Sequence, residues 1–103
     1  MDVKQSLQVV SRTGKYVVGY RQTLKEIHRK RPVIVVASNK AERLMLDVIR
    51  INAKAVNIPV LLTDLTPSEL GLALRKPFPT SFIAILEPGS SDIVEQAGVE
   101  QSG

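Results

Sequence analysis

The sequence predicts an α/β protein, a three-layer α/β/α sandwich built on a small, mixed four-stranded sheet. Two observations carry this prediction. Short β-branched runs alternate along the chain with segments whose apolar residues recur at helical spacing. One run, residues 33–37 (VIVVA), is apolar throughout, which is typical of a strand covered by helices on both faces. With 103 residues, we expect a single domain over residues 1–97 and a disordered tail over residues 98–103.

The first third of the chain predicts helix, strand and helix in succession. Residues 3–11 carry apolar side chains at i, i+4 and i+7 and predict the first helix. A turn and a β-branched strand at 16–18 follow, and Gly19 then precedes a second amphipathic helix. We expect Pro32 to end that helix, because proline disfavours the helical conformation in the residue before it.

Residues 41–56 predict the longest helix. An Arg43–Asp47 pair at i, i+4 is expected on its outer surface. We also assign Phe82 and Ile83 of the last strand to the core. Four apolar residues of the helix recur at helical spacing and are expected to face that core: Leu44, Val48, Ile51 and Ala55.

Residues typical of helix and strand ends indicate the remaining elements. A short apolar strand is predicted at 60–62, after an Asn-Ile-Pro break. The sequence TPSE at 66–69 has the form of a capping box and predicts a helix over 67–75. The last strand is predicted at 82–86, followed by a Pro-Gly turn and a short serine-capped helix to about Gln96.

Positive charge is concentrated at the start of the chain. The net charge is +4, yet residues 1–31 hold eight Lys/Arg against two acids, whereas residues 32–103 hold six against eight. This polarity indicates an acidic partner, most commonly nucleic acid, although a basic surface can also serve solubility alone. The absence of Cys excludes disulfides and thiolate metal sites and favours a reducing, cytoplasmic location. No apolar run is long enough for a membrane span, and the first ten residues lack a signal-peptide core.

Motifs for catalysis or cofactor binding are missing. Gly14-Lys15 resembles the end of a phosphate-binding loop, but Val9 and Tyr16 occupy positions that require Gly and Ser/Thr. The dinucleotide fingerprint GxGxxG is also absent. The single histidine, His28, lies on a basic helical face, where a surface or phosphate-contacting role is favoured over catalysis. We therefore expect no enzyme activity, no cofactor and no metal.

The segment from Gly19 to His28 is the strongest candidate binding element. Glycine lets a partner approach the backbone, and the first N–H groups of the following helix lack intrahelical acceptors. Arg21, Lys25 and His28 line one face of that helix. From these residues alone, a solvated basic face is about as well supported as nucleic-acid binding.

Five segments in order, TGKYVVGYRQTLKEI, VIVVASNK, NIPV, SELGLALRKPF and AILEPGSSDI, resemble a known family. They are similar to the thirtieth large-subunit ribosomal proteins of archaea and eukaryotes, within a superfamily of small α/β/α sandwiches that bind kink-turn RNA. The resemblance runs from about Ser11 to Val94. It implies a non-catalytic constituent of the large ribosomal subunit in the cytoplasm, a monomer when free. Its implied partners are ribosomal RNA, through a kink-turn or related internal loop, and neighbouring large-subunit proteins.

The resemblance also implies which residues contact RNA. Arg21 and Gln22 stand where the wider superfamily has Asn and Glu that read guanine edges, and the ribosomal branch favours a basic residue at the first position. Phe78 falls where an aromatic stacks on a splayed base. Two departures are Arg75, where glycine is usual, and Pro79, which replaces a basic residue. The full expected RNA-binding set, His28 included, is Gly19, Arg21, Gln22, Lys25, His28, Asn39, Lys40, Arg75, Lys76 and Phe78.

Several alternatives stay open at this point. Phe78 could be a core or loop-packing aromatic, and Asn39 could cap the helix that follows it. The protein could be a stand-alone kink-turn binder of a guide-RNA particle or an RNA regulator. A protein–protein module with a basic face is an alternative of a different class. A nucleotide-using enzyme would need a phosphate loop that the chain lacks.

Overall fold

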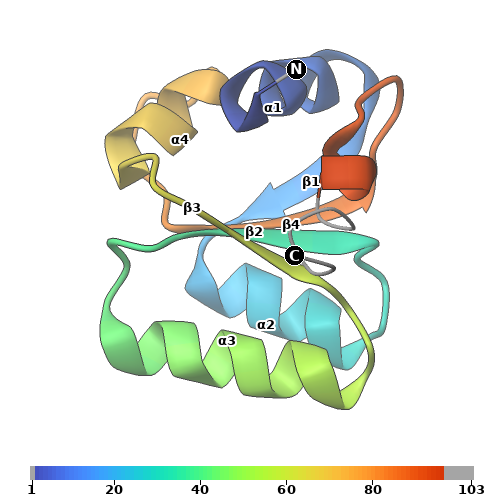
Figure 1. The fold of residues 1–103 in the computed structure, drawn as a ribbon, viewed down its shortest axis with the longest axis vertical. Helices are drawn as coiled ribbons and strands as arrows, with labels where there is room; N and C mark the ends of the chain where they lie inside the picture. The colour runs from blue at the N-terminus through green and yellow to red at the C-terminus, as the bar shows by residue number, and fades with distance from the viewer. Residues whose placement is uncertain (1, 97–103) are drawn as a thin grey trace.

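The computed structural model describes residues 2–96 and contains the alternating helices and strands that the sequence predicts (Figure 1). Between residues 3 and 87, every predicted bound except the end of the second helix lies within two residues of the observed one. Residues 93–96 are helical, and the end predicted for that last helix near Gln96 lies at the limit of the described residues. The predicted tail at 98–103 lies outside the described residues. The elements are α1 (Val3–Thr13), β1 (Lys15–Val18), α2 (Tyr20–His28), β2 (Ile34–Ser38), α3 (Arg43–Ala55), β3 (Val60–Thr63), α4 (Pro67–Ala73) and β4 (Phe82–Glu87).

The four strands form one mixed sheet in the order β1-β4-β2-β3. β4 is antiparallel to both β1 and β2, whereas β3 is parallel to β2. β1, β2 and β3 therefore run in the same direction, and their carboxyl ends meet the start of β4 at one edge of the sheet. We call this edge, at the left of Figure 1, the carboxyl edge. It comprises Gly19 and residues 39–42, 64–66 and 74–81.

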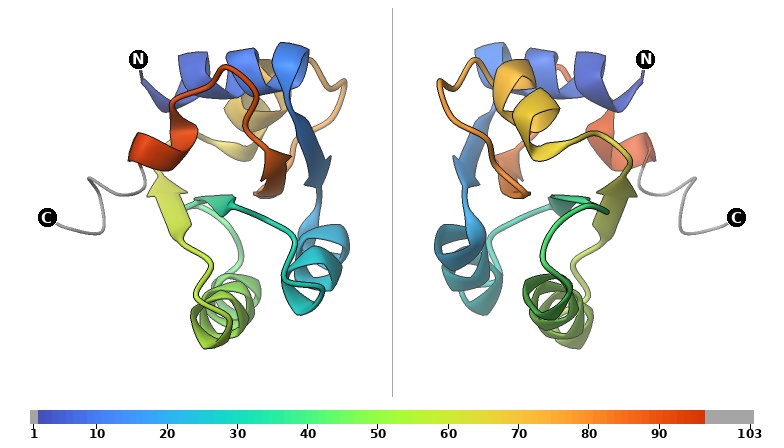
Figure 2. Two further views of the ribbon diagram at one scale, coloured as in Figure 1. Left: turned by 90° about the vertical axis from the view of Figure 1, so that its right-hand side faces the viewer. Right: turned by 90° about the vertical axis from the view of Figure 1, so that its left-hand side faces the viewer.

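Helices cover both faces of the sheet, which confirms the three-layer sandwich. α1 and α4 lie on one face, and α2 and α3 on the other, as both side views show (Figure 2). β2 is buried along its whole length, with Ile34 and Val36 in the core beneath α1 and α4. Val35 and Ala37 point into the second core, beneath α2 and α3. This double burial explains the uninterrupted apolar run in the sequence.

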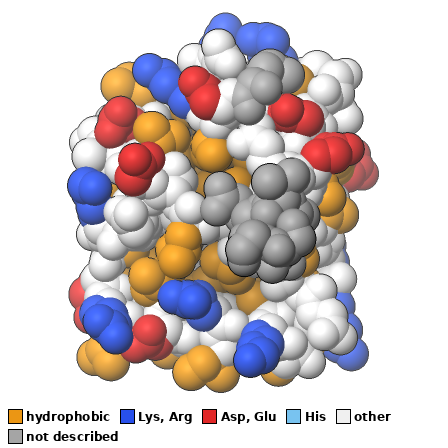
Figure 3. Space-filling view, viewed as in Figure 1, with side chains coloured by type: hydrophobic (Ala, Val, Ile, Leu, Met, Phe, Trp, Pro, Cys, Tyr) orange, Lys and Arg blue, Asp and Glu red, His pale blue; other side chains and the backbone are white. Residues whose placement is uncertain are grey.

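The predicted inward face of α3 is wrong. Leu44 and Ile51 are 71% and 68% exposed, and apolar atoms reach the surface over α3 at the bottom of Figure 3. Val48 is only partly buried and Ala55 is exposed. The helix carries two apolar stripes at helical spacing, and the stripe against β2 and β3 is the other one: Leu46, Ile49 and Ala53. Periodicity alone gives no preference between two such stripes.

The predicted end of α2 is also wrong, because this helix stops at His28 rather than continuing to Pro32. Lys30 adopts a left-handed conformation (φ 59°) and turns the chain toward β2. Guanidinium nitrogens of Arg29 and Arg31 lie 3.5 and 3.4 Å from the buried carboxylate of Glu26. These ion pairs favour the turn over another helical one.

Predictions that rest on residues close together in the sequence are confirmed. Thr66 Oγ1 accepts from the Glu69 N–H at 3.1 Å, and the Glu69 carboxylate accepts from the Thr66 N–H at 3.0 Å, which completes the capping box. Arg43 and Asp47 form their i, i+4 pair at 3.7 Å. Among residues 2–96, no helix has the length and apolar character needed to cross a membrane.

Candidate nucleic-acid interface

Gly19 leaves the backbone accessible at the carboxyl edge. Its φ of +98° favours glycine, and, its two chain neighbours aside, no heavy atom of the described residues lies within 4 Å of the position that a Cβ would take. Its N–H donates to the Phe82 carbonyl at 2.8 Å, which fixes the start of α2 against β4. None of the described side chains caps α2. The N–H groups of the first turn of α2 are therefore available to an acceptor from outside, with the positive end of the helix dipole behind them.

A pocket of about 450 Å³ lies beside Gly19. Phe82 is buried and packs edge-to-face with Tyr20, the ring centroids 5.7 Å apart. Phe78 lies on the wall of the pocket with 47% of its surface exposed, so it is not a core aromatic. An exposed aromatic face beside a pocket suits a flat, unstacked ring system. The pocket is lined by Val18, Gly19, Tyr20, Glu42, Met45 and residues 78–82.

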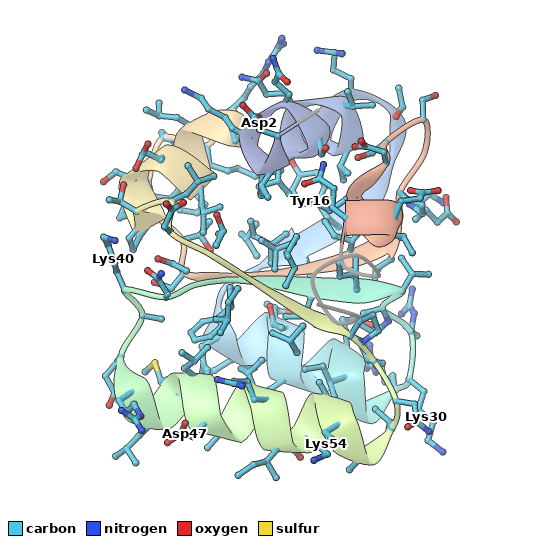
Figure 4. The ribbon with its side chains drawn as sticks, in the orientation of Figure 1. Asp2, Tyr16, Lys30, Lys40, Asp47 and Lys54 are labelled. Carbon is cyan, nitrogen blue, oxygen red and sulfur yellow. The ribbon has the colours of Figure 1, made fainter. Side chains whose placement is uncertain are left out.

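The loop after β2 belongs to the same edge. Asn39 and Lys40 are exposed, and the Asn39 N–H donates to the Thr63 carbonyl at 2.8 Å. Lys40 Nζ lies 3.3 Å from the Asp64 carbonyl, and Figure 4 shows its side chain at the left edge. The alternative that Asn39 caps α3 is excluded, because the Glu42 carboxylate accepts from the first N–H groups of that helix.

The loop after α4 adds two cations. Arg75 is exposed and left-handed (φ 59°), which accounts for the glycine usual at this position in the family that the sequence resembles. Lys76 Nζ lies 5.5 Å from the centre of the Tyr16 ring, a cation–π contact with β1. Glu69 of α4 accepts a hydrogen bond from the Thr66 N–H, and this bond lowers the pKa of the Glu69 carboxyl and favours its anionic form.

Basic side chains continue along α2, away from the carboxyl edge. A shallow groove of about 410 Å³ is lined by Leu24 and by four basic residues, Arg21, Lys25, His28 and Arg29. Gln22 is exposed in the same turn as Arg21. His28 lies at the far end of α2, roughly 13 Å from its start, with Nε2 3.0 Å from Asn52 Oδ1. The structure thus places the candidate residues at or beside the carboxyl edge, except Lys25 and His28, which lie further along α2 in this groove.

Sequence reasoning missed four pocket residues that belong to no recognised motif. Met45 and Glu42 come from the start of α3, and Thr80 and Ser81 from the approach to β4. Met45 is 40% exposed, an apolar residue beside the stripe that α3 buries. Nothing local in the sequence indicates that these residues share a pocket with Gly19, because their proximity depends on the order of the strands.

Comparison with known proteins places the chain among ribosomal proteins. The profile of the Ribosomal protein L7Ae/L30e/S12e/Gadd45 family matches residues 1–95. The chain belongs to this family. The membership confirms the resemblance that the five sequence segments indicated.

Members of this family from archaea match over nearly their whole length. The chain is 35% identical to the large ribosomal subunit protein eL30 of Methanocaldococcus jannaschii, covering 100% of this chain and 94% of the relative. It is 35% identical to that of Methanococcus vannielii (91% and 90%) and 30% identical to that of Pyrobaculum neutrophilum (92% and 94%). A solved structure of a Bacillus halodurans protein of unknown function has the same fold, with a TM-score of 0.75, 19% identity and coverage of 94% and 97%.

Proposed function

We propose that this protein is a non-catalytic structural constituent of the large ribosomal subunit in the cytoplasm, and that its carboxyl edge binds kinked ribosomal RNA. The archaeal relatives named as large-subunit proteins support the ribosomal role, since the chain covers 90–94% of each of the three. The observation that carries the RNA site is the meeting of three separate segments, at Gly19, Asn39 and Phe78, on one edge of the sheet.

The uncapped start of α2 suits a sharp bend in RNA. Proteins that select RNA by structure bind loops, bulges and bends, because the A-form major groove is closed to side chains. Gly19 admits a base edge or phosphate to the N–H groups behind it. Arg21 and Gln22 supply donors and an acceptor for base edges, while Lys25, one turn further, reaches a phosphate.

The pocket supplies the second half of the site. A base taken out of the stack fits beside Phe78, where stacking on an aromatic is worth roughly 1–3 kcal/mol. Lys40, Arg75 and Lys76 lie around the same edge and suit phosphates on either side of that base. His28 is proposed as an outer phosphate contact, on a backbone that follows the groove along α2.

Sedimentation with ribosomal subunits tests this function. A tagged chain expressed in an archaeal host is expected to co-sediment with the large subunit and not with the small one. Ultraviolet crosslinks to ribosomal RNA are expected in the two tryptic peptides that together cover residues 16–25 and in the peptide that contains Phe78. A chain found only at the top of the gradient, or bound to a small guide RNA, would overturn the ribosomal role.

A further inference from the structure

The loop that carries Phe78 rests on α4 at a glycine. Gly71 is buried in the middle of this helix. A Cβ added to Gly71 would lie 2.2 Å from the Phe78 carbonyl oxygen, 3.2 Å from its carbonyl carbon and 3.4 Å from Pro79 Cα. The Phe78 backbone therefore occupies the space that any other residue at position 71 would fill.

Both ends of this loop are tied to neighbouring elements. On one side, the Lys76 N–H donates to the Gly71 carbonyl at 2.9 Å. On the other, the N–H of buried Thr80 donates to the Pro67 carbonyl at 3.1 Å, and its hydroxyl to the Phe82 carbonyl at 3.1 Å. The contact with Gly71 lies between these two anchors. The backbone is thus fixed at three points, while the Phe78 ring stays exposed.

The helical backbone conformation does not require a glycine at position 71. A glycine inside a helix destabilises it by roughly 1 kcal/mol relative to alanine, and α4 is only seven residues long. Gly71 is not among the described residues with positive φ, so an L-residue could adopt its backbone conformation. What the position requires is the missing side chain.

We propose that Gly71 is a positioning residue for RNA binding. By admitting the Phe78 carbonyl against α4, it sets the Phe78 ring on the pocket wall before RNA arrives. The inference rests on the proposed function through the contact between Phe78 and RNA. An alanine at position 71 would push the Phe78 carbonyl away by about 0.8 Å, to the 3.0 Å limit that real Cβ contacts respect. The ring would move with it.

A double-mutant cycle tests the coupling. Gly71→Ala, Phe78→Ala and the double variant are titrated with a kink-turn RNA, at a temperature where circular dichroism shows every variant folded. Gly14→Ala is the matched control, because its Cβ would also lie 2.2 Å from a backbone carbonyl oxygen, that of Glu87, at the opposite edge of the sheet. The control reproduces the steric conflict without touching the proposed site.

Phe78→Ala is expected to weaken binding by about 5- to 140-fold, the range that loss of one stacked base predicts. Gly71→Ala is expected to weaken it more than fivefold in the wild-type background and less than twofold beside Phe78→Ala, while Gly14→Ala keeps wild-type affinity. Full affinity in Gly71→Ala, an equal loss in both backgrounds, or an equal loss in Gly14→Ala would overturn the inference. If Phe78→Ala binds normally, the proposed RNA contact itself fails.

Should Gly71→Ala not fold, the wild-type protein provides the test by nuclear magnetic resonance. The free protein is expected to show contacts between the Gly71 and Pro79 α-protons and a backbone order parameter at Phe78 near 0.85, typical of rigid structure. Missing contacts, or an order parameter below about 0.6, would show that Gly71 does not fix the loop.

Discussion

The two apolar stripes of α3 make a prediction about stability. Ile49 and Ile51 are two residues apart on one helix, yet Ile49 is fully buried and Ile51 is 68% exposed. Replacing a buried isoleucine by alanine typically destabilises a protein by about 2–5 kcal/mol, because transfer free energy is lost and a cavity remains. At Ile51 only about a third of that surface leaves water, which corresponds to about 0.5–1 kcal/mol.

Helix propensity acts equally at both positions and favours alanine by a few tenths of a kcal/mol. We therefore expect Ile49→Ala to lower the free energy of unfolding by more than about 2 kcal/mol, and Ile51→Ala by less than about 0.7. In a domain of this size, that separates the melting temperatures by roughly 5–10 °C or more. Urea unfolding measures the difference in stability. Circular dichroism follows the transition, since the chain has no tryptophan for fluorescence. Equal losses for the two variants would refute the assignment of the α3 faces.

Three further predictions concern a side-chain contact, a helix cap and a turn. The hydrogen bond from the Ser6 hydroxyl holds the pKa of Asp92 below its ordinary 3.8. The Asp92 carboxylate therefore stabilises the folded state above pH 3.8. This contribution is lost as the pH falls through the lowered pKa. Acid titration of the unfolding free energy is expected to be less steep in Ser6→Ala. Thr66→Ala, which breaks the α4 capping box, is expected to lose about 1 kcal/mol in urea unfolding. Gly89→Ala is expected to lose more than about 1 kcal/mol in the same assay, since φ is +63° and its Cβ would meet Thr13 at 2.3 Å.

Each of these predictions has a result that contradicts it. The first fails if Ser6→Ala and wild type show the same slope below pH 3.8. Thr66→Ser retains a hydroxyl and serves as the control for the cap, so equal stability of Thr66→Ala and Thr66→Ser would remove the cap's contribution. Wild-type stability in Gly89→Ala would mean that the turn after β4 relaxes without cost.

Much of the fold could be predicted from short-range patterns. The run at 33–37 indicated a strand buried on both faces, and TPSE indicated a capped helix, because each signal is complete within a few residues. Two features could not be predicted this way. The buried stripe of α3 depends on how the helix meets β2 and β3, and the end of α2 depends on ion pairs between Glu26 and two arginines beyond it.

The candidate site divides in the same manner. Residue chemistry and the family resemblance singled out Gly19, Arg21 and Phe78, whose glycine, charge and aromatic ring are visible in the sequence, whereas the exposure of the Phe78 ring is known only from the structure. That these residues share one edge follows from strand order, which the sequence does not display. His28 has the right charge but lies at the far end of α2. Gly71 lies within the SELGLALRKPF segment of the family resemblance, but nothing in the sequence indicates its proposed positioning role, because that role depends on a carbonyl seven residues away.

The most direct test of the central claim is RNA selectivity through Arg21. The protein is titrated with a kink-turn RNA and with the same stem whose G·A pairs are replaced by Watson–Crick pairs, at two salt concentrations. Arg12→Ala, which removes an exposed arginine from α1 on the opposite face, is the matched control for Arg21→Ala. We predict strong preference for the kinked RNA, lost in Arg21→Ala and retained in Arg12→Ala. Equal, salt-sensitive binding to both RNAs would mean that the carboxyl edge is only an electrostatic surface, and would contradict the account.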